Sequence, residues 1–327
     1  MAEKIQEAPL EFVPFFKSVI WGGNSIYGYK GLPADKENVG ESWEISEVPG
    51  HVSIVADGEY KGKSLSELIT RFGSQLLGEK VMKKYDGKFP LLIKFIDAKD
   101  NLSLQVHPDD ALALKRHGSL GKTEMWYIID TDKNAKICAG LKKEITPQQY
   151  EQSVKDGSFM DNVAIHDSAP GDVFFLPAGR VHGIGAGNLL AEIQESSDVT
   201  YRIYDYDRKD VDGNPRELHI DAAKDAIDFK VYDNYKEPPA DMHDPDVLLV
   251  ENEHFKTRRI IVDKDRHISL PDDSFTVLIC IEGEIIIKTG ENLKTIKQGQ
   301  TFLLPAVIKE MYLSGKGILL CVDNNPN

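Results

Sequence analysis

Along most of the chain, short runs rich in Val, Ile, Phe and Tyr alternate with clusters of Gly, Pro, Asn and Asp. Alternation of apolar and polar residues over about 4 to 8 positions is typical of half-buried β-strands, and turn residues at this spacing are typical of sandwiches and barrels. We therefore predict an all-β fold. The clearest predicted strands are LSLQVH (102–107), EMWYIID (124–130), DVFFLP (172–177), LLAEIQ (189–194), VTYRIYDYD (199–207), FTVLICI (275–281) and EIIIKTG (284–290).

Helix-start signals are few. The segment SLSE (64–67) has the form of a capping box ahead of an apolar run. Thr146, Pro147 and Gln149 combine a cap, a first-turn proline and a glutamine at the third helical position. A third short helix is expected after Pro108, through DDALALKRH.

Two segments about 130 residues apart share a pattern, because 171–177 and 299–305 both read Gly, five residues, Pro. This echo suggests a duplicated β-module, so we expect two jelly-roll barrels with a few helices inserted in the first. The stretch YKEPPADMHDPD (235–246) concentrates proline and charge without periodicity, which is typical of a linker. We predict a first domain over residues 1–240 and a second over residues 246–327.

Composition agrees with a globular protein, since 41% of the 327 residues are hydrophobic and 28% are charged. This length allows one large domain or two smaller ones. Lys and Arg number 39 and Asp and Glu number 53, which leaves a formal charge of −14 at pH 7. The negative excess disfavours nucleic acids and anionic membranes as partners, but it allows a small anionic ligand held by local cations.

Three widely spaced cysteines, Cys138, Cys280 and Cys321, fit reduced thiols better than a disulfide framework. The N-terminal segment MAEKIQEAPLEF has acidic residues where a signal peptide needs an apolar stretch, and no apolar run approaches a membrane span. We therefore expect a soluble cytoplasmic protein, either a monomer or a weak homo-oligomer.

Polar residues on one face of the predicted strand 102–107 are the first candidates for chemistry. The apolar positions of this strand share one face, and the opposite face carries Ser103, Gln105 and His107. An amide and an imidazole two positions apart indicate a ligand-binding face. A lone histidine here would more often be an exposed edge residue.

Two further residues favour the ligand-binding interpretation. Glu124 opens an apolar strand, and a buried carboxylate must be paired, protonated or bound to a metal. His182 comes five residues after Pro177, beyond a strand and a tight turn. With His107, and with Gln105 as a further donor, they offer the ligands of a divalent transition-metal site with one open position. Two histidines and a carboxylate also suit iron, so the ligands alone do not choose the metal.

These motifs resemble those of known proteins. Gly171-x5-Pro177-x-Gly179-x2-His182 is similar to the second cupin motif, and Gln105-x-His107 followed by Glu124 is similar to the first, with Gln in place of its leading His. The cupin motif alone would indicate only the fold. The blocks SLQVHPDD, GKTEMWYI, PAGRVH and AEIQESSDVTYRIYDYDR together resemble the type I mannose-6-phosphate isomerases, in particular their short bacterial form. The match extends from about residue 21 to residue 208, and the long helical insertion of larger members has no room here.

The resemblance implies zinc-dependent interconversion of mannose 6-phosphate and fructose 6-phosphate through an enediolate, with one Zn²⁺ per chain and a small sugar phosphate as the partner. It implies that the zinc ligands are Gln105, His107, Glu124 and His182. Moving a proton between C1 and C2 of the sugar also requires a base, an electrophile for the oxygens and an anchor for the phosphate.

Further residues match functional positions of the family. Arg202 matches the catalytic arginine, Lys122 an active-site lysine and Glu192 an acidic residue proposed for proton transfer. Arg208 falls where a cation holds the substrate phosphate, and Ser103 is a second phosphate candidate. Which group abstracts the proton stays open. Without the resemblance, Lys122 and Arg208 would be read as solvated surface charges and Glu192 as a salt-bridged barrel residue.

The second predicted domain lacks these ligands. After Pro305 the chain reads AVIKEM, without a histidine at the position of His182. We expect residues 246–327 to form a degenerate cupin domain that completes the fold of a catalytic domain at 1–240. Two alternatives are an iron-dependent cupin oxygenase with the same ligands and a sugar-phosphate sensor without turnover. The presence of Arg202 and Lys122 argues against both, because neither needs this proton-transfer apparatus.

Overall fold

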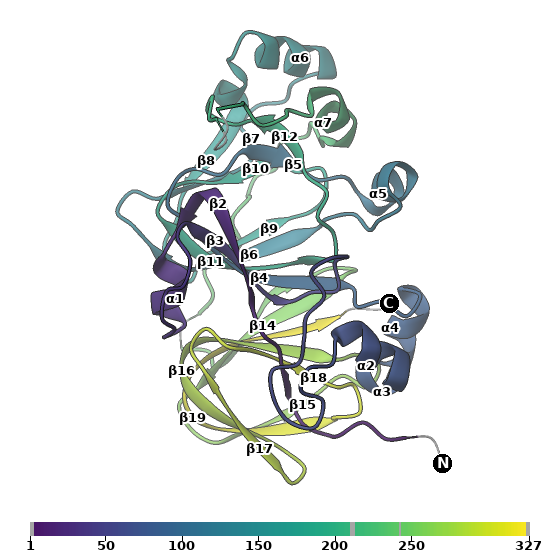
Figure 1. The fold of residues 1–327 in the computed structure, drawn as a ribbon. Helices are drawn as coiled ribbons and strands as arrows, with labels where there is room; N and C mark the ends of the chain where they lie inside the picture. The colour runs from purple at the N-terminus through teal and green to yellow at the C-terminus, as the bar shows by residue number, and fades with distance from the viewer. Residues whose placement is uncertain (1–2, 210–212, 242, 325–327) are drawn as a thin grey trace.

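The computed structural model describes residues 3–209, 213–241 and 243–324. Its strands form three sheets in which every strand pair is antiparallel, stacked from the helical end of the molecule towards the barrel formed by the C-terminal strands (Figure 1). We call them the outer, the middle and the C-terminal sheet. The predicted all-β fold with few helices is confirmed.

The outer and middle sheets face each other across an apolar core. Trp126 and Phe174 of the middle sheet share this core with Ile137 and Ile184 of the outer sheet. In spatial order, the outer sheet contains β12 (Tyr201–Tyr204), β5 (Leu104–Val106), β10 (His182–Ile184), β7 (Lys136–Leu141) and β8 (Val163–Asp167), and the middle sheet contains β2 (Phe15–Gly23), β3 (Val39–Ile45), β4 (Leu91–Ala98), β11 (Asn188–Glu195), β6 (Glu124–Thr131) and β9 (Val173–Leu176).

The centre of the middle sheet is buried on both faces, since every residue of β4 and β11 is buried. On the face turned away from the outer sheet, Met125 and Tyr127 share a second apolar core with Phe255 and Val277 of the C-terminal sheet. This core joins the two parts of the chain. The C-terminal sheet contains, in order, β1 (Leu10–Glu11), β18 (Thr301–Leu304), β16 (Thr276–Thr289), β19 (Glu310–Asn324), β14 (Phe255–Val262) and β13 (Asp246–Glu251), with β15 (Arg266–Ser269) paired to β19 and β17 (Asn292–Lys297) paired to β16.

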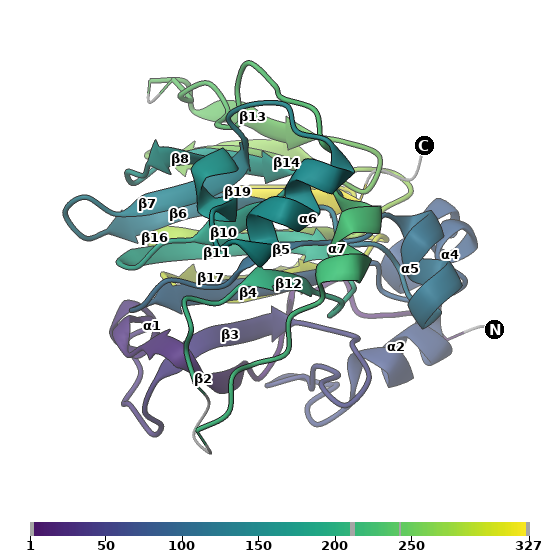
Figure 2. The same ribbon diagram turned by 90° about the horizontal axis from the view of Figure 1, so that it is seen from above.

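The three predicted helix starts are confirmed. The capping boxes at Ser64 and Thr146 begin α2 (Leu65–Phe72) and α6 (Pro147–Lys155), and Asp109 caps α5 (Asp110–His117). Helix α6 and helix α7 (Ile220–Ala226) lie over the outer sheet (Figure 2). Within the described ranges, no helix has the length and hydropathy to cross a membrane. The remaining helices are α1 (Ser25–Tyr29), α3 (Ser74–Leu77), α4 (Glu79–Lys84), α7 (Ile220–Ala226) and the 3₁₀-helix η1 (Phe159–Asn162).

One strand prediction is wrong in its division. The segments 275–281 and 284–290, predicted as two strands, form the single strand β16. Gly283 lies at the break with φ +81°, and a Cβ there would lie 2.1 Å from the carbonyl oxygen of Lys316 on β19. Glycine therefore bends one continuous strand at this position instead of ending it.

The two Gly-x5-Pro segments occupy matching places in the middle and C-terminal sheets. Leu176 of β9 pairs with Glu124, and Leu304 of β18 pairs with Thr276. Matching registers in both sheets support the predicted duplication. Where the first copy has Glu124, the second has a threonine whose hydroxyl donates a 2.5 Å hydrogen bond to Asp323. The domain boundary near residues 240–246 stays a prediction, and residue 242 lies outside the described residues.

Replacing Gly283 with alanine tests the close approach of β16 and β19. Both Gly283 and Gly290 have positive φ, but a Cβ at Gly290 would meet only a side-chain oxygen of Glu7 at 3.9 Å. We expect Gly290→Ala to cost about 1–2 kcal/mol for its backbone conformation, and Gly283→Ala to lower the free energy of unfolding by clearly more. Urea denaturation of both variants measures this, and equal losses would contradict the role assigned to Gly283.

Candidate metal centre and active site

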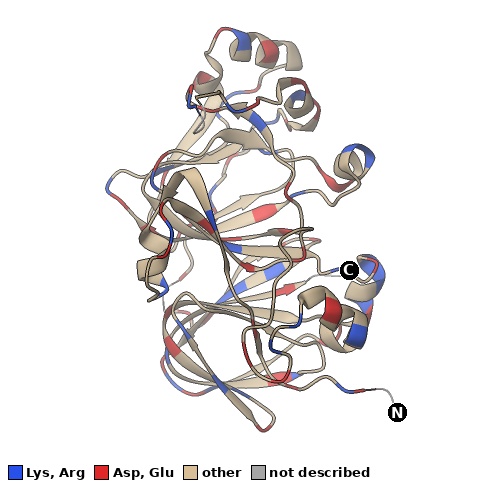
Figure 3. Cartoon of the chain, viewed as in Figure 1, with Lys and Arg blue, Asp and Glu red and all other residues tan. Residues whose placement is uncertain are grey.

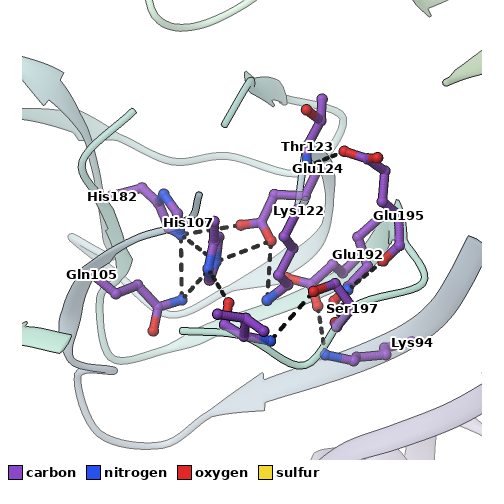
Figure 4. A network of polar contacts seen from close by, with 12 residues as sticks. Lys94, Gln105, His107, Lys122, Thr123, Glu124, His182, Glu192, Glu195 and Ser197 are labelled. Carbon is purple, nitrogen blue, oxygen red and sulfur yellow. Dashed lines mark hydrogen bonds and ion pairs between the residues drawn. The ribbon is translucent and has the colours of Figure 1, made fainter. Parts of the chain in front are cut away.

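His107, Glu124 and His182 come together between the outer and middle sheets. His107 follows β5, Glu124 begins β6 and His182 begins β10. The Nε2 atoms of the two histidines are 3.1 Å apart, and they lie 3.5 Å (His107) and 3.2 Å (His182) from the Glu124 carboxylate oxygens (Figure 4). At most 1% of each residue is exposed. The structure thus brings together the three residues at the centre of the predicted ligand set.

The backbone explains how distant segments deliver these side chains. Gly179 has φ +90°, a conformation that favours glycine, and its amide donates a 2.9 Å hydrogen bond to the carbonyl of His107. The turn after β9 is therefore attached to the end of β5. From this turn the chain enters β10, where His182 pairs with Gln105 of β5.

Gln105 is the fourth predicted ligand, and its amide lies beside both imidazoles. Its Nε2 atom is 3.3 Å from Nε2 of His182 and 3.5 Å from Nε2 of His107. A flip of the amide exchanges nitrogen and oxygen without moving the rest of the side chain. The carbonyl oxygen can therefore take the position that faces the histidines.

The protonation states of the cluster fit a cation. His107 and His182 each direct Nδ1 at a backbone carbonyl, at 2.9 Å from Val199 and 2.8 Å from Arg180, which leaves both Nε2 atoms as acceptors towards Glu124. Burial lowers the pKa of both histidines, for His182 to about 3, so the rings are neutral. Burial also raises the pKa of Glu124, and neither of its carboxylate oxygens has a hydrogen-bond partner. A divalent metal ion would satisfy these unpartnered atoms.

A chain of buried charges continues from the cluster. The ammonium of Lys122 is 3.3 Å from Glu124, and that of Lys94 is 3.0 Å from Glu192. Glu192 also accepts a 2.9 Å hydrogen bond from the indole of Trp126. Burial acts to raise the pKa of Glu192, but Lys94 and Lys122 outweigh it and hold the pKa well below its usual range. Glu192 is therefore ionised at neutral pH.

Sequence reasoning missed two members of this charge chain. Lys94 lies on β4, and its ammonium is also 3.6 Å from Glu41 of β3, which accepts a 2.7 Å hydrogen bond from the indole of Trp43. Figure 3 shows such charges on strands within the sheet layers as well as on the surface helices. The available signal was a lysine inside the apolar run LLIKFI, because a charge in a buried strand needs a partner.

A cavity of about 360 Å³ opens beside the cluster, within the size range of about 300–1,000 Å³ typical of small-molecule sites. Arg202 pairs with Gln105 across β12 and β5, and its Nε atom is buried without a hydrogen-bond partner. Burial and the neighbouring Arg216 lower the pKa of Arg202. The polar residues that line the cavity include Ser103, Gln105, Lys122, Glu192, Arg202 and Arg216.

Arg208, predicted to hold the phosphate, is not among the residues that line this cavity. Its guanidinium is 2.6 Å from Asp205 and also donates to the Asn101 carbonyl. Arg216 shares the same Asp205 carboxylate, at 2.5 Å, and does line the cavity. The missed Arg216 lies in a segment without periodicity, and only the fold brings it to the site.

The jelly-roll sheets and the cluster of imidazole and carboxylate at their centre are those of a cupin protein with a candidate metal site. Two family models match the chain: the catalytic domain of type I phosphomannose isomerases at residues 10–155, and the cupin domain of mannose-6-phosphate isomerases at residues 247–324. The chain belongs to the type I phosphomannose isomerase family.

Relatives support this assignment over nearly the whole chain. A mannose-6-phosphate isomerase of Bacillus subtilis is 37% identical over 94% of this chain and 96% of its own length. One from Streptococcus mutans is 42% identical over 64% of each chain. The crystal structure of a Bacillus subtilis mannose 6-phosphate isomerase superimposes with a TM-score of 0.86 at 33% identity, covering 96% of this chain and 99% of the other.

Replacing Lys94 with methionine tests the buried charge chain. The variant leaves Glu192 buried without its main partner, which should cost about 3–5 kcal/mol at neutral pH. In the wild type the pKa of Glu192 is lowered, so its contribution to stability is present above about pH 4.5 and is lost as the pH falls. In Lys94→Met its pKa should be raised, so the cost of the variant should grow as the pH rises from about 4 to 7.

Urea denaturation across this pH range measures the effect. In a Glu192→Gln background the pH-dependent part of the cost should become clearly smaller, because only the more distant Glu41 is left to titrate beside residue 94. A cost that is the same at pH 4 and pH 7 would contradict the pairing.

Proposed function

We propose that the chain interconverts mannose 6-phosphate and fructose 6-phosphate through an enediolate, with one catalytic zinc ion held by Gln105, His107, Glu124 and His182. The observation that carries the proposal is the buried carboxylate of Glu124, which has no hydrogen-bond partner and faces two neutral imidazoles beside a cavity lined with cations. The activity named for the relatives agrees with it.

Zinc supplies a Lewis acid that polarises the substrate oxygens without redox chemistry. The two histidines and Glu124, with the Gln105 amide as a fourth donor, match the nitrogen and oxygen donors of catalytic zinc sites. The neutral state of both histidines supports this assignment, since each can offer Nε2 without first losing a proton.

We assign the stabilisation of charge on the substrate to Arg202. Its lowered pKa makes the guanidinium a stronger hydrogen-bond and proton donor to an oxygen that gains negative charge at C1 or C2. Its unpartnered Nε atom is available for such a contact.

Glu192 and Lys122 are the further groups for proton transfer. Glu192 is ionised, yet Lys94 and Trp126 both hold it, so it becomes an effective base only when substrate binding weakens the contact with Lys94. Lys122 faces Glu124 and lines the cavity, where it can shuttle a proton or fix the sugar oxygens.

The phosphate is proposed to lie at the arginine-rich end of the cavity. Ser103 lines this cavity and offers a hydroxyl donor. Arg208 stays a candidate anchor beside Arg216, because both arginines are held by one carboxylate, Asp205, and a phosphate can take the place of that partner.

The remaining proposals concern the whole chain. Residues 1–240 would act as the catalytic domain and 246–327 as a cupin domain without metal ligands. All three cysteines are buried free thiols, which supports a reducing, cytoplasmic location. We propose a monomer or a weak homo-oligomer with a small sugar phosphate, not nucleic acid or membrane, as its partner.

The function is tested by following conversion of mannose 6-phosphate before and after treatment with a chelator. Chelation should abolish turnover and zinc should restore it, whereas iron should not. His182→Ala should lose the metal of this site and turnover together. Arg202→Ala should keep the metal and lower kcat by about 10²–10⁴. Oxygen uptake with iron, or tight binding without turnover, would instead favour an oxygenase or a sensor.

The phosphate anchor is tested by KM. Arg216→Ala and Arg208→Ala should each raise KM for mannose 6-phosphate with little change in kcat, by about tenfold for Arg216, which corresponds to about 1.4 kcal/mol. The effect should be larger for Arg216 because it lines the cavity. Arg71→Ala, at an exposed arginine paired with Glu3, serves as the control. An unchanged KM in either variant would show that the substituted arginine does not hold the phosphate.

A further inference from the structure

A second group of metal-ligating side chains lies next to the segment that carries Glu124. Asp110 is the first residue of α5, Glu195 is the last residue of β11, and His254 precedes β14. One ligand atom of each lies within 4.8 Å of the others. The three residues come from parts of the chain far apart in sequence, with His254 supplied by the C-terminal part.

Two of these side chains are buried with unpartnered atoms. Glu195 is 1% exposed and His254 is 8% exposed. Oε1 of Glu195 and Nδ1 of His254 are 3.1 Å apart, yet neither atom has a hydrogen-bond partner. A buried oxygen and nitrogen this close without an aligned hydrogen bond are rare in folded proteins, and each such case calls for a missing partner.

The remaining atoms of the cluster are held in place, so the unpartnered atoms stay oriented towards one another. The second oxygen of Glu195 accepts a 2.7 Å hydrogen bond from the amide of Thr123. Asp110 accepts one of 2.7 Å from the amide of Gly121. The backbone of His254 donates to Asn252 at 2.7 Å.

We propose that Asp110, Glu195 and His254 bind a second divalent transition-metal ion, separate from the one at His107, Glu124 and His182. An imidazole and two carboxylates are a typical donor set for zinc and neighbouring metals. In a tetrahedral site with bonds of about 2.0–2.2 Å, such an ion holds its donors about 3.3–3.6 Å apart. The three ligand atoms lie within 4.8 Å of one another, so side-chain movements of about 1 Å would bring them to the ion. The exposed Asp110 provides the entry path and room for water ligands.

The position of this site indicates a structural role. Asp110 and Glu195 bind the amides of residues 121 and 123, and these flank Lys122 and precede Glu124. A metal ion here would fasten that segment to His254 of the C-terminal part. It would thereby fix the segment that delivers two residues of the first site.

The competing explanation is a proton shared by the two carboxylates. Burial, and then the nearby Asp110, raise the pKa of Glu195 to about 8, which would make it a neutral acid at pH 7. In that case the cluster needs no metal. A metal ion would displace this proton, and counting bound metal separates the two explanations.

The experiment is to equilibrate the full chain and its variants with buffered free zinc and to measure zinc per chain by mass spectrometry. The wild type should hold two ions. His254→Ala and Glu195→Gln should each hold one, as should His182→Ala, which removes the other site. Glu195→Gln keeps the side-chain size and the acceptor for Thr123, so it guards against a folding defect in His254→Ala. Glu253→Gln, at an exposed carboxylate 3.7 Å from the other imidazole nitrogen, should keep both ions.

The pattern of counts decides the matter. One ion in the wild type, lost in His182→Ala and unchanged in His254→Ala and Glu195→Gln, would overturn the second site while leaving the proposed isomerase intact. Two ions bound to His182→Ala would also contradict the assignment. So would a Glu195→Gln variant that still binds as many ions as the wild type. A count that falls by one in both cluster variants supports it.

Discussion

The burial of the Glu124 carboxylate is the constraint on which the rest of the site depends. A charge at the end of an inner strand, in a sheet that is covered on both faces, is unstable without a nearby cation. The two histidines, kept neutral by burial, leave this role to a metal ion and to Lys122. The cavity lies beside the cluster, where Gln105 and Lys122 line it and separate it from the buried carboxylate.

The layered architecture explains how water is excluded from such a charge. The outer sheet covers one face of the middle sheet, and the C-terminal sheet covers the other through a separate apolar core. The low dielectric between these layers strengthens the pairing of Lys94 with Glu192 and makes an unpaired charge costly. The C-terminal part thus contributes to the site without offering a residue to the first cluster.

Local sequence patterns were sufficient to predict much of the fold and the centre of the site. Strand alternation, capping boxes and the spacing from Pro177 to His182 depend on neighbouring residues, so β5, β9, α2 and α6 could be predicted. The partners of Lys94 and Arg216 could not, because strand pairing and loop packing alone bring them close. The sequence predicts a strand end near Gly283 and not a bend for the same reason. The need for a glycine there comes from the close approach of β19, which the local sequence does not reveal.

The hydrogen bond between Thr276 and Asp323 bears on how this protein could be re-engineered. It occupies the register that Glu124 and Gln194 occupy in the first copy, but the interior beside it is filled with apolar side chains such as Phe302 and Leu278. Installing a carboxylate at 276 would therefore not create a second catalytic pocket. A designer would first have to hollow out that interior, and the stability lost in doing so sets the limit on a bifunctional version of this chain.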